Sequence, residues 1–225
     1  MRGDGATGSL FCIGRVGADC ASGAFLTVLS LLASMLLVCP DQASSELAVF
    51  GQAENGVGTL MVKRADNRLE RLTGKGTLPI YEGDECKTEA GSKAFIRFAD
   101  GTQLAMNENT TFIVRTRMDR ARAITQTLKL LSGEIWVKAT PTKTYEVETP
   151  AGTAVLKGGE FDFQVRPDGK SILTSFDGVV EYDTPFGSCS ISAFRQSHGE
   201  RGKKCTEPNL IDNTEGIAWT ITVRP

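Results

Sequence analysis

The sequence predicts an all-β protein, a compact stack of short antiparallel strands arranged as a sandwich or a solenoid-like stack. Apolar and polar residues alternate strictly in residues 145–149 and 161–165, which gives a pleated strand one face of each kind. Asp168-Gly169 and Asp177-Gly178 supply tight turns between such strands. No helical pattern of respectable length interrupts them, so we expect strands to follow one another directly.

Upstream of this stretch, further strand and turn patterns follow in order. Residues 59–72 predict a strand, a turn at Asp66-Asn67 and a return strand. Residues 94–98 and 103–106 predict a hairpin about Asp100-Gly101. Residues 111–115 and 128–138 predict further strands, and the glycines that close them recur at unequal intervals. The unequal spacing argues against a regular solenoid repeat.

The first 45 residues have the layout of a signal peptide or a membrane anchor helix. Residues 24–38 are almost continuously apolar and end at Cys39-Pro40, after a leader that contains Arg2 and Arg15. The run is shorter than the roughly 20 residues that span a bilayer. Cleavage near Ala43 or Ser45 is therefore favoured over retention as an anchor; lipid attachment at Cys39 is a third alternative.

All three alternatives export the rest of the chain. We therefore expect a periplasmic or secreted protein, anchored in the inner membrane through residues 24–38 if the leader is retained.

Export gives the remaining cysteines an oxidising environment. Cys189 and Cys205 bracket a polar stretch and predict a disulfide in a C-terminal extension, residues 188–225. A loop of this size is stabilised by about 3 kcal/mol in the chain-entropy account of disulfides. The alternative is two unpaired thiols in a flexible tail. Cys86 is then left over, and its position after the Gly83-Asp84 turn predicts a buried, inert thiol.

Four segments in order resemble the FecR domain of bacterial envelope proteins. They are Y-E-G-D followed by G-S-K-A-F-I-R-F-A-D-G-T (residues 81–102), L-L-S-G-E-I-W-V-K (residues 130–138), T-P-A-G-T-A-V-L-K-G-G-E-F-D-F-Q-V (residues 149–165) and D-G-V-V-E-Y (residues 177–182). The resemblance spans residues 56–183, within a domain placed at residues 46–187. Lys157 stands where the family usually has Arg, and Gly159 where it has Thr. Lys157 keeps the charge but lacks the planar fork of a guanidinium.

This resemblance implies a role in the envelope, where family members relay a signal from an outer-membrane transporter to a cytoplasmic sigma factor. We expect an exported, non-catalytic module that binds or senses a protein or other ligand, with a protein partner in the envelope. The alternative is a structural envelope scaffold.

The residues that carry charge suggest an interaction surface. Arg115, Arg117, Arg120 and Arg122 form a basic cluster that suits an anionic partner, although a solvated hairpin tip is the usual explanation of such a cluster. We count them, with Lys157, as candidate interaction residues. The formal net charge of -2 gives no support for a nucleic-acid partner.

Catalytic, metal-binding and cofactor-binding residues are not predicted, and we expect no enzyme activity. The single histidine, His198, lies in a polar, glycine-rich stretch, and three scattered cysteines do not form a zinc pattern. Four aspartates adjoin glycines, for which turn geometry is the simplest explanation: Asp84, Asp100, Asp168 and Asp177. A hydrolase that uses such carboxylates remains a third hypothesis.

Overall fold

The computed structural model describes residues 49–118, 124–141, 144–211 and Trp219, all within the compact unit Glu46–Pro225. These residues form seventeen strands, so the predicted all-β class is confirmed for this part of the chain. The predicted signal or anchor helix lies outside the described residues. Within them, no helix is long and apolar enough to cross a membrane.

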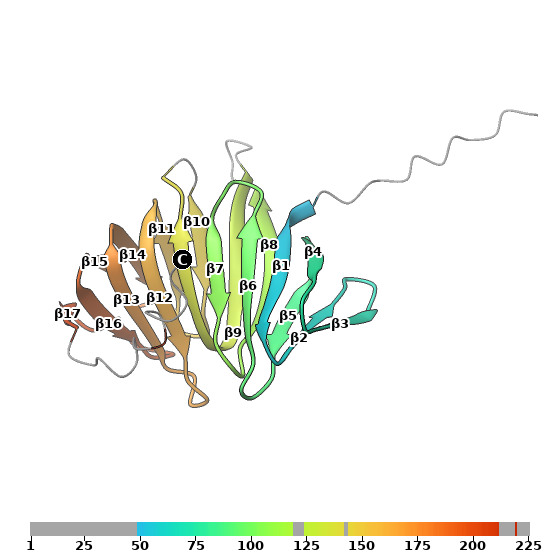
Figure 1. Cartoon of the computed structure of the whole chain (residues 1–225). Helices are drawn as coiled ribbons and strands as arrows, with labels where there is room; N and C mark the ends of the chain where they lie inside the picture. The colour runs from blue at the N-terminus through green and yellow to red at the C-terminus, as the bar shows by residue number, and fades with distance from the viewer. Residues whose placement is uncertain (1–48, 119–123, 142–143, 212–218, 220–225) are drawn as a thin grey trace, which may run out of the picture. The chain divides into compact units, whose positions relative to one another are not determined.

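The strands form two sheets that face each other (Figure 1). Sheet A has the order β4-β1-β6-β7-β9-β12-β13-β16-β17. Sheet B has the order β3-β2-β5-β8-β9-β10-β11-β14-β15. Because β9 belongs to both, the ladders connect all seventeen described strands.

The bounds of the strands follow their order in the chain. They are β1 (Val49–Val57), β2 (Thr59–Lys63), β3 (Leu69–Thr73), β4 (Thr77–Tyr81), β5 (Glu85–Thr88), β6 (Lys93–Phe98), β7 (Gln103–Met106), β8 (Thr111–Met118), β9 (Ile124–Ala139), β10 (Tyr145–Glu148), β11 (Thr153–Leu156), β12 (Gly159–Val165), β13 (Ser171–Asp177), β14 (Val179–Thr184), β15 (Gly187–Ser192), β16 (Arg195–Gly199) and β17 (Asn209–Leu210).

Strand β9 passes from sheet B into sheet A at Gly133. Its first part pairs with β8 up to Ser132, and its last part pairs with β7 and β12. Gly133 has a φ of +88°, and a Cβ there would lie 2.4 Å from the Cα of Thr110. Only glycine combines this backbone conformation with so close an approach. The Thr110 hydroxyl closes the bend: it accepts from the Glu134 N–H (2.9 Å) and donates to the Glu134 carbonyl (3.0 Å).

The hydrophobic core lies between the two sheets. On β6, Ala94, Ile96 and Phe98 face inward and are buried, while Arg97 is exposed. Opposite them, Tyr145 of β10 is fully buried, and its ring centroid lies 6.2 Å from that of Phe98. The alternation in the sequence thus corresponds to burial in one core shared by both sheets.

Two features of the strand arrangement differ from the prediction. The ladder between β9 and β10 is parallel, whereas a uniformly antiparallel stack was expected. The connection between these strands, residues 140–144, contains positions outside the described residues. In addition, β9 is 16 residues long because it serves both sheets, so not all strands are short.

The polar stretch between Cys189 and Cys205, predicted as a loop, contains β15 and β16, which extend the two sheets. Cys189 and Ile191 of β15 point into the core and alternate with exposed serines. In β15 only one face is buried, whereas in β16 the adjacent polar residues Gln196 and Ser197 are both buried. His198 accordingly lies on β16, exposed, and not in a loop.

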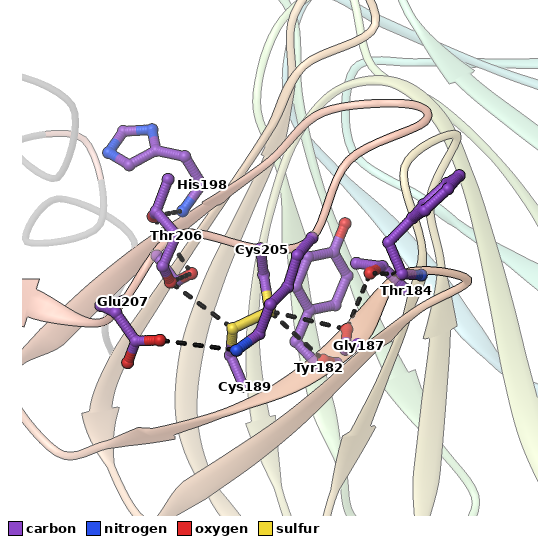
Figure 2. Close-up of a disulfide and its surroundings, with 11 residues drawn as sticks. Tyr182, Thr184, Gly187, Cys189, His198, Cys205, Thr206 and Glu207 are labelled. Carbon is purple, nitrogen blue, oxygen red and sulfur yellow. Dashed lines mark hydrogen bonds and ion pairs between the residues drawn. A yellow bond between two sulfur atoms is a disulfide. The ribbon is translucent and has the colours of Figure 1, made fainter.

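Cys189 and Cys205 form the disulfide expected from the sequence (Figure 2), with Cα atoms 6.2 Å apart. Both residues are buried members of the core cluster. The bridge ties residues 200–208 to the inner face of β15, so it covers this end of the core. Cys86 is free and fully buried, and burial raises the pKa of its thiol. A thiol held protonated in this way is a poor nucleophile.

A buried ion pair holds the other end of the stack. Arg64, whose side chain is 7% exposed, donates to Asp84 (2.6 Å) and to the Pro79 carbonyl (2.8 Å). It also donates twice to Glu70, at 2.9 and 2.8 Å. Asp84 is 2% exposed and accepts from the Tyr81 N–H. Turn geometry alone therefore does not explain Asp84.

We predict that Asp84→Ala destabilises the protein by about 3–5 kcal/mol, because it leaves the buried Arg64 guanidinium without its closest partner. Denaturant unfolding of the wild type and of Asp84→Ala measures this difference in stability. Asp66 provides a matched control, since it also pairs with an arginine, Arg68, but in solvent. Asp66→Ala should leave the unfolding midpoint unchanged within error, and equal effects of the two substitutions would contradict the account.

Candidate functional site

A groove of about 600 Å³ opens where β10 turns into β11. Its rim includes the four-residue corner T-P-A-G, from Thr149 to Gly152. Lys129 and Leu131 of β9 line it, together with the turn residue Pro185 and with Arg201 from the segment that follows β16. The groove therefore combines side chains from segments far apart in the chain.

The T-P-A-G corner is rigid because Thr149 closes it. The Thr149 N–H donates to the Gly152 carbonyl (2.8 Å), and the hydroxyl also donates to that carbonyl (2.9 Å). The same hydroxyl lies 3.2 Å from the hydroxyl of buried Tyr182. Gly152 passes so close to β14 that a Cβ would lie 2.5 Å from the Asp183 carbonyl oxygen. The corner is thus fixed to the sheet.

Charges of both signs line the groove at one level of sheet B. Lys129, Glu148, Thr153 and Asp183 are successive neighbours across β9, β10, β11 and β14. Arg201 adds a second cation at the edge. Such an arrangement suits recognition of a partner that carries both charges, since complementary charges mainly set specificity and association rate.

Three of the predicted interaction residues lie within the described part of the chain, on separate strands of sheet B or beside them. Arg115 and Arg117 lie exposed on β8, and Arg117 pairs with Glu146 of β10 at 3.3 Å. The basic character is therefore partly neutralised by a neighbouring carboxylate. Lys157, also exposed, follows β11, three strands from β8 in sheet B. Arg120 and Arg122 lie outside the described residues.

The aspartates that adjoin glycines have separate partners and do not meet at one site. Asp100 accepts from the Thr102 N–H (3.0 Å) and from the Tyr145 hydroxyl, which ties the β6–β7 turn to β10. Asp168 accepts from the Lys170 N–H in an exposed turn. In the part of the chain that the structure describes, no three acidic, cysteine or histidine side chains gather where a metal ion would bind.

A second cluster covers the outer face of sheet A. Trp136 is buried there with Ala105 and Phe176, and Phe95, Ile211 and Trp219 pack against them. Trp136 is therefore buried outside the main core, and Trp219 lies half-buried against this cluster.

Beside this cluster, two buried carboxyl groups face each other across β9 and β12. Asp162 is 3% exposed and Glu134 is 7% exposed. Burial raises the pKa of Asp162 well above its usual range, and the adjacent Glu134 raises it further. Burial also raises the pKa of Glu134, against hydrogen bonds from Asn107 and Trp219 that lower it. The pair therefore retains a proton where exposed carboxyl groups lose theirs.

The segment that carries the groove corner matches a known family. Residues 84–181 match the family described as "FecR protein". Over these residues the chain is similar to the FecR family. The matched segment includes Lys129, Glu148 and the whole T-P-A-G corner, whereas Asp183, Pro185 and Arg201 lie beyond its end. No curated protein matches the chain.

Two solved structures share the fold. Both are crystal structures of a "putative anti-sigma factor" from Parabacteroides distasonis ATCC 8503, at 18% identity and TM-scores of 0.52 and 0.51. Each comparison covers 60% of this chain. The chain spans 64% and 63% of those two chains, which is less than two thirds of their length.

Sequence reasoning found one side of the groove and missed the other. The T-P-A-G corner was singled out for its family resemblance, and it forms part of the rim. Asp183, Pro185 and Arg201 were missed because nothing local in the sequence shows that β14 lies beside β11. Gly152 is the one local signal that could have indicated the contact with β14, since a close backbone contact with a neighbouring strand requires a residue without a side chain.

We predict that the protein loses stability as pH rises above the usual range for carboxyl groups, partly because of Asp162. The pKa of Asp162 is higher in the folded than in the unfolded chain. Its contribution is therefore fully present below the unfolded pKa and is lost as pH rises towards the folded pKa. Urea unfolding of Asp162→Asn should show a gain over the wild type that grows as pH rises above about 4, the ordinary pKa of an aspartate carboxyl group. Asp168→Asn, in an exposed turn, should leave the pH dependence of stability unchanged. If the stability of Asp162→Asn changed with pH in parallel with that of the wild type, Asp162 would not be the source of the pH dependence.

Proposed function

We propose that this chain is an exported, non-catalytic binding module of the bacterial envelope that recognises a protein partner at the T-P-A-G groove. One observation carries the proposal: the corner that the FecR domain shares with its family forms the rim of a preformed groove. Binding at a rigid corner costs little ordering of the module itself.

A protein segment suits this groove better than a small molecule does. Sites for small ligands are mostly apolar and enclose most of the ligand. This groove instead has Lys129, Glu148, Asp183 and Arg201 on its walls, with Leu131 as an exposed apolar contact. Interfaces between proteins commonly combine such a small apolar centre with a charged rim.

Signalling is the proposed purpose of this binding. The resemblance to FecR proteins implies a relay of signals across the envelope, and two solved structures that share the fold are each described as a "putative anti-sigma factor". We therefore infer a regulatory role, in which occupation of the groove is the input. A scaffold that only joins envelope components is the alternative.

Two observations support the proposal that the module lies outside the cytoplasm. The apolar residues 24–38 match the layout of a signal peptide or anchor, and the Cys189–Cys205 disulfide suits an oxidising compartment. We propose a periplasmic or secreted module, tethered to the inner membrane if the leader is retained. N-terminal sequencing of the mature protein from fractionated cells distinguishes these two forms.

Photo-crosslinking in intact cells tests the groove. We predict that a photoreactive amino acid at Pro185 captures a defined protein partner, whereas the same group at Lys75, in the exposed β3–β4 turn, does not. The double variant Glu148→Arg and Asp183→Arg should weaken capture at least about tenfold, which corresponds to about 1.4 kcal/mol.

The control is Glu54→Arg, an exposed charge reversal on β1 of sheet A, which should leave capture intact. Equal capture at positions 75 and 185, or undiminished capture by the folded double variant, would contradict the proposal.

A further inference from the structure

The segment that follows β16, residues 200–208, forms an arch that carries three cations. Two of them are paired with glutamates of the same arch: Lys203 with Glu200 (2.9 Å) and Lys204 with Glu207 (3.5 Å). Arg201 is exposed and makes no hydrogen bond or ion pair with any other described residue. It is also the one of these three cations that lines the groove. The groove therefore has an unoccupied guanidinium at its edge.

The arch is attached to the two sheets by different contacts. Thr206 holds it to β16 of sheet A: its N–H donates to the His198 carbonyl (2.9 Å), and its hydroxyl accepts from the His198 N–H (2.9 Å). Its carbonyl also accepts from the Ser197 hydroxyl (2.7 Å). The covalent attachment to sheet B, where the groove lies, is the bond from Cys205 to Cys189 of β15. Cys205 is the only residue of the arch that is buried.

Tyr182 of β14 connects the disulfide with the T-P-A-G corner. The sulfur of Cys205 lies 3.8 Å from the Tyr182 carbonyl oxygen (Figure 2), and the Tyr182 hydroxyl lies 3.2 Å from that of Thr149 in the corner. Gly199, which precedes the arch, packs so close to Tyr182 that a Cβ would lie 2.3 Å from its hydroxyl oxygen. Arg201 therefore lies between two points of the chain that both contact a side chain fixed to the groove.

We propose that the Cys189–Cys205 disulfide positions Arg201 at the groove, and that Arg201 there binds a carboxylate of the protein partner. The inference rests on the proposed binding of a partner at this groove, and it names the chemical group that one wall recognises. A guanidinium keeps its charge at every physiological pH, and its donors form a planar fork that matches the two oxygens of a carboxylate.

The disulfide matters because a fixed cation loses less conformational freedom on binding than a mobile one. Four residues separate Arg201 from Cys205, so the intact bridge limits their separation to roughly 14 Å even for an extended chain. Without the bridge, the arch keeps its hydrogen bonds to β16 but loses its covalent link to β15. The position of Arg201 over the groove is then no longer fixed.

Photo-crosslinking from position 185 in intact cells measures the contribution of Arg201. Arg201→Ala should lower the yield of captured partner about tenfold, because a charge-assisted hydrogen bond is lost. Lys203→Ala is the matched control, since it removes a cation from the same arch that is already paired with Glu200. Its capture yield should equal that of the wild type.

Complementary charge reversal tests the carboxylate itself. Once the captured protein is identified from the cross-linked peptide, each acidic residue of the captured segment is replaced by Lys in turn. One such replacement should weaken capture by the wild type and restore capture by Arg201→Glu. Restoration requires that the two reversed charges meet, so a general loss of stability in either protein does not produce it.

The role of the disulfide is tested with the double variant Cys189→Ala and Cys205→Ala. It should lose capture about as strongly as Arg201→Ala does, and adding Arg201→Ala to it should lower capture little further, because the guanidinium is already misplaced. The NMR order parameter of the Arg201 amide should fall from about 0.85 to below about 0.6, while that of β9 stays unchanged. Cys86→Ala, which removes the buried free thiol, should change neither measurement.

The outcomes separate this inference from the proposed function. Absence of any captured partner at position 185 of the wild type would contradict the proposed function, and the order parameters would still test the positioning of Arg201. Capture that Arg201→Ala leaves undiminished, or that no reversed carboxylate restores to Arg201→Glu, would overturn the inference while partner binding stands.

Strictly additive losses in the combined variant would overturn the role of the disulfide. So would an order parameter below about 0.6 for Arg201 in the wild type, whether or not the protein without the bridge folds.

Discussion

The bend of β9 at Gly133 is the constraint on which the rest of the structure depends. Gly133 has a positive φ and no room for a side chain, and the Thr110 hydroxyl bonds both the N–H and the carbonyl of Glu134. Thr110 is itself held by the Thr88 hydroxyl, which accepts from its N–H at 3.1 Å. Because this one strand enters both sheets, it sets their relative register and closes the core between them.

Local pattern was enough to predict the strands with clear alternation, the Asp100-Gly101 hairpin and the Cys189–Cys205 pairing, but not β15 and β16. It was not enough where a role depends on distant neighbours. The sequence around Asp84 indicates only a turn, and its pairing with Arg64 appears only after β2 and β5 are neighbours. The parallel β9–β10 ladder and the buried Asp162–Glu134 pair also depend on contacts between segments that are distant in the sequence. The pairing of such segments decides which polar residues become buried.

The candidate site was likewise predictable only in the part that depends on local sequence. The T-P-A-G corner was found as a motif, but the groove exists because β14 and the segment after β16 meet it from later in the chain. On β14, Asp183 belongs to the groove, and its neighbour across the ladder is Ser188 of β15. The groove therefore lies one strand from β15, the last strand of sheet B.

Native-state hydrogen exchange of β9 tests most directly whether its bend unites the two sheets. If Gly133 joins them into one cooperative unit, amides in residues 124–132 and 134–139 should exchange with the same free energy, equal to that of global unfolding. Their denaturant dependence should be equally steep, because both require the same large exposure of surface. Clearly different free energies on the two sides of Gly133 would show that the sheets open separately and would contradict the account.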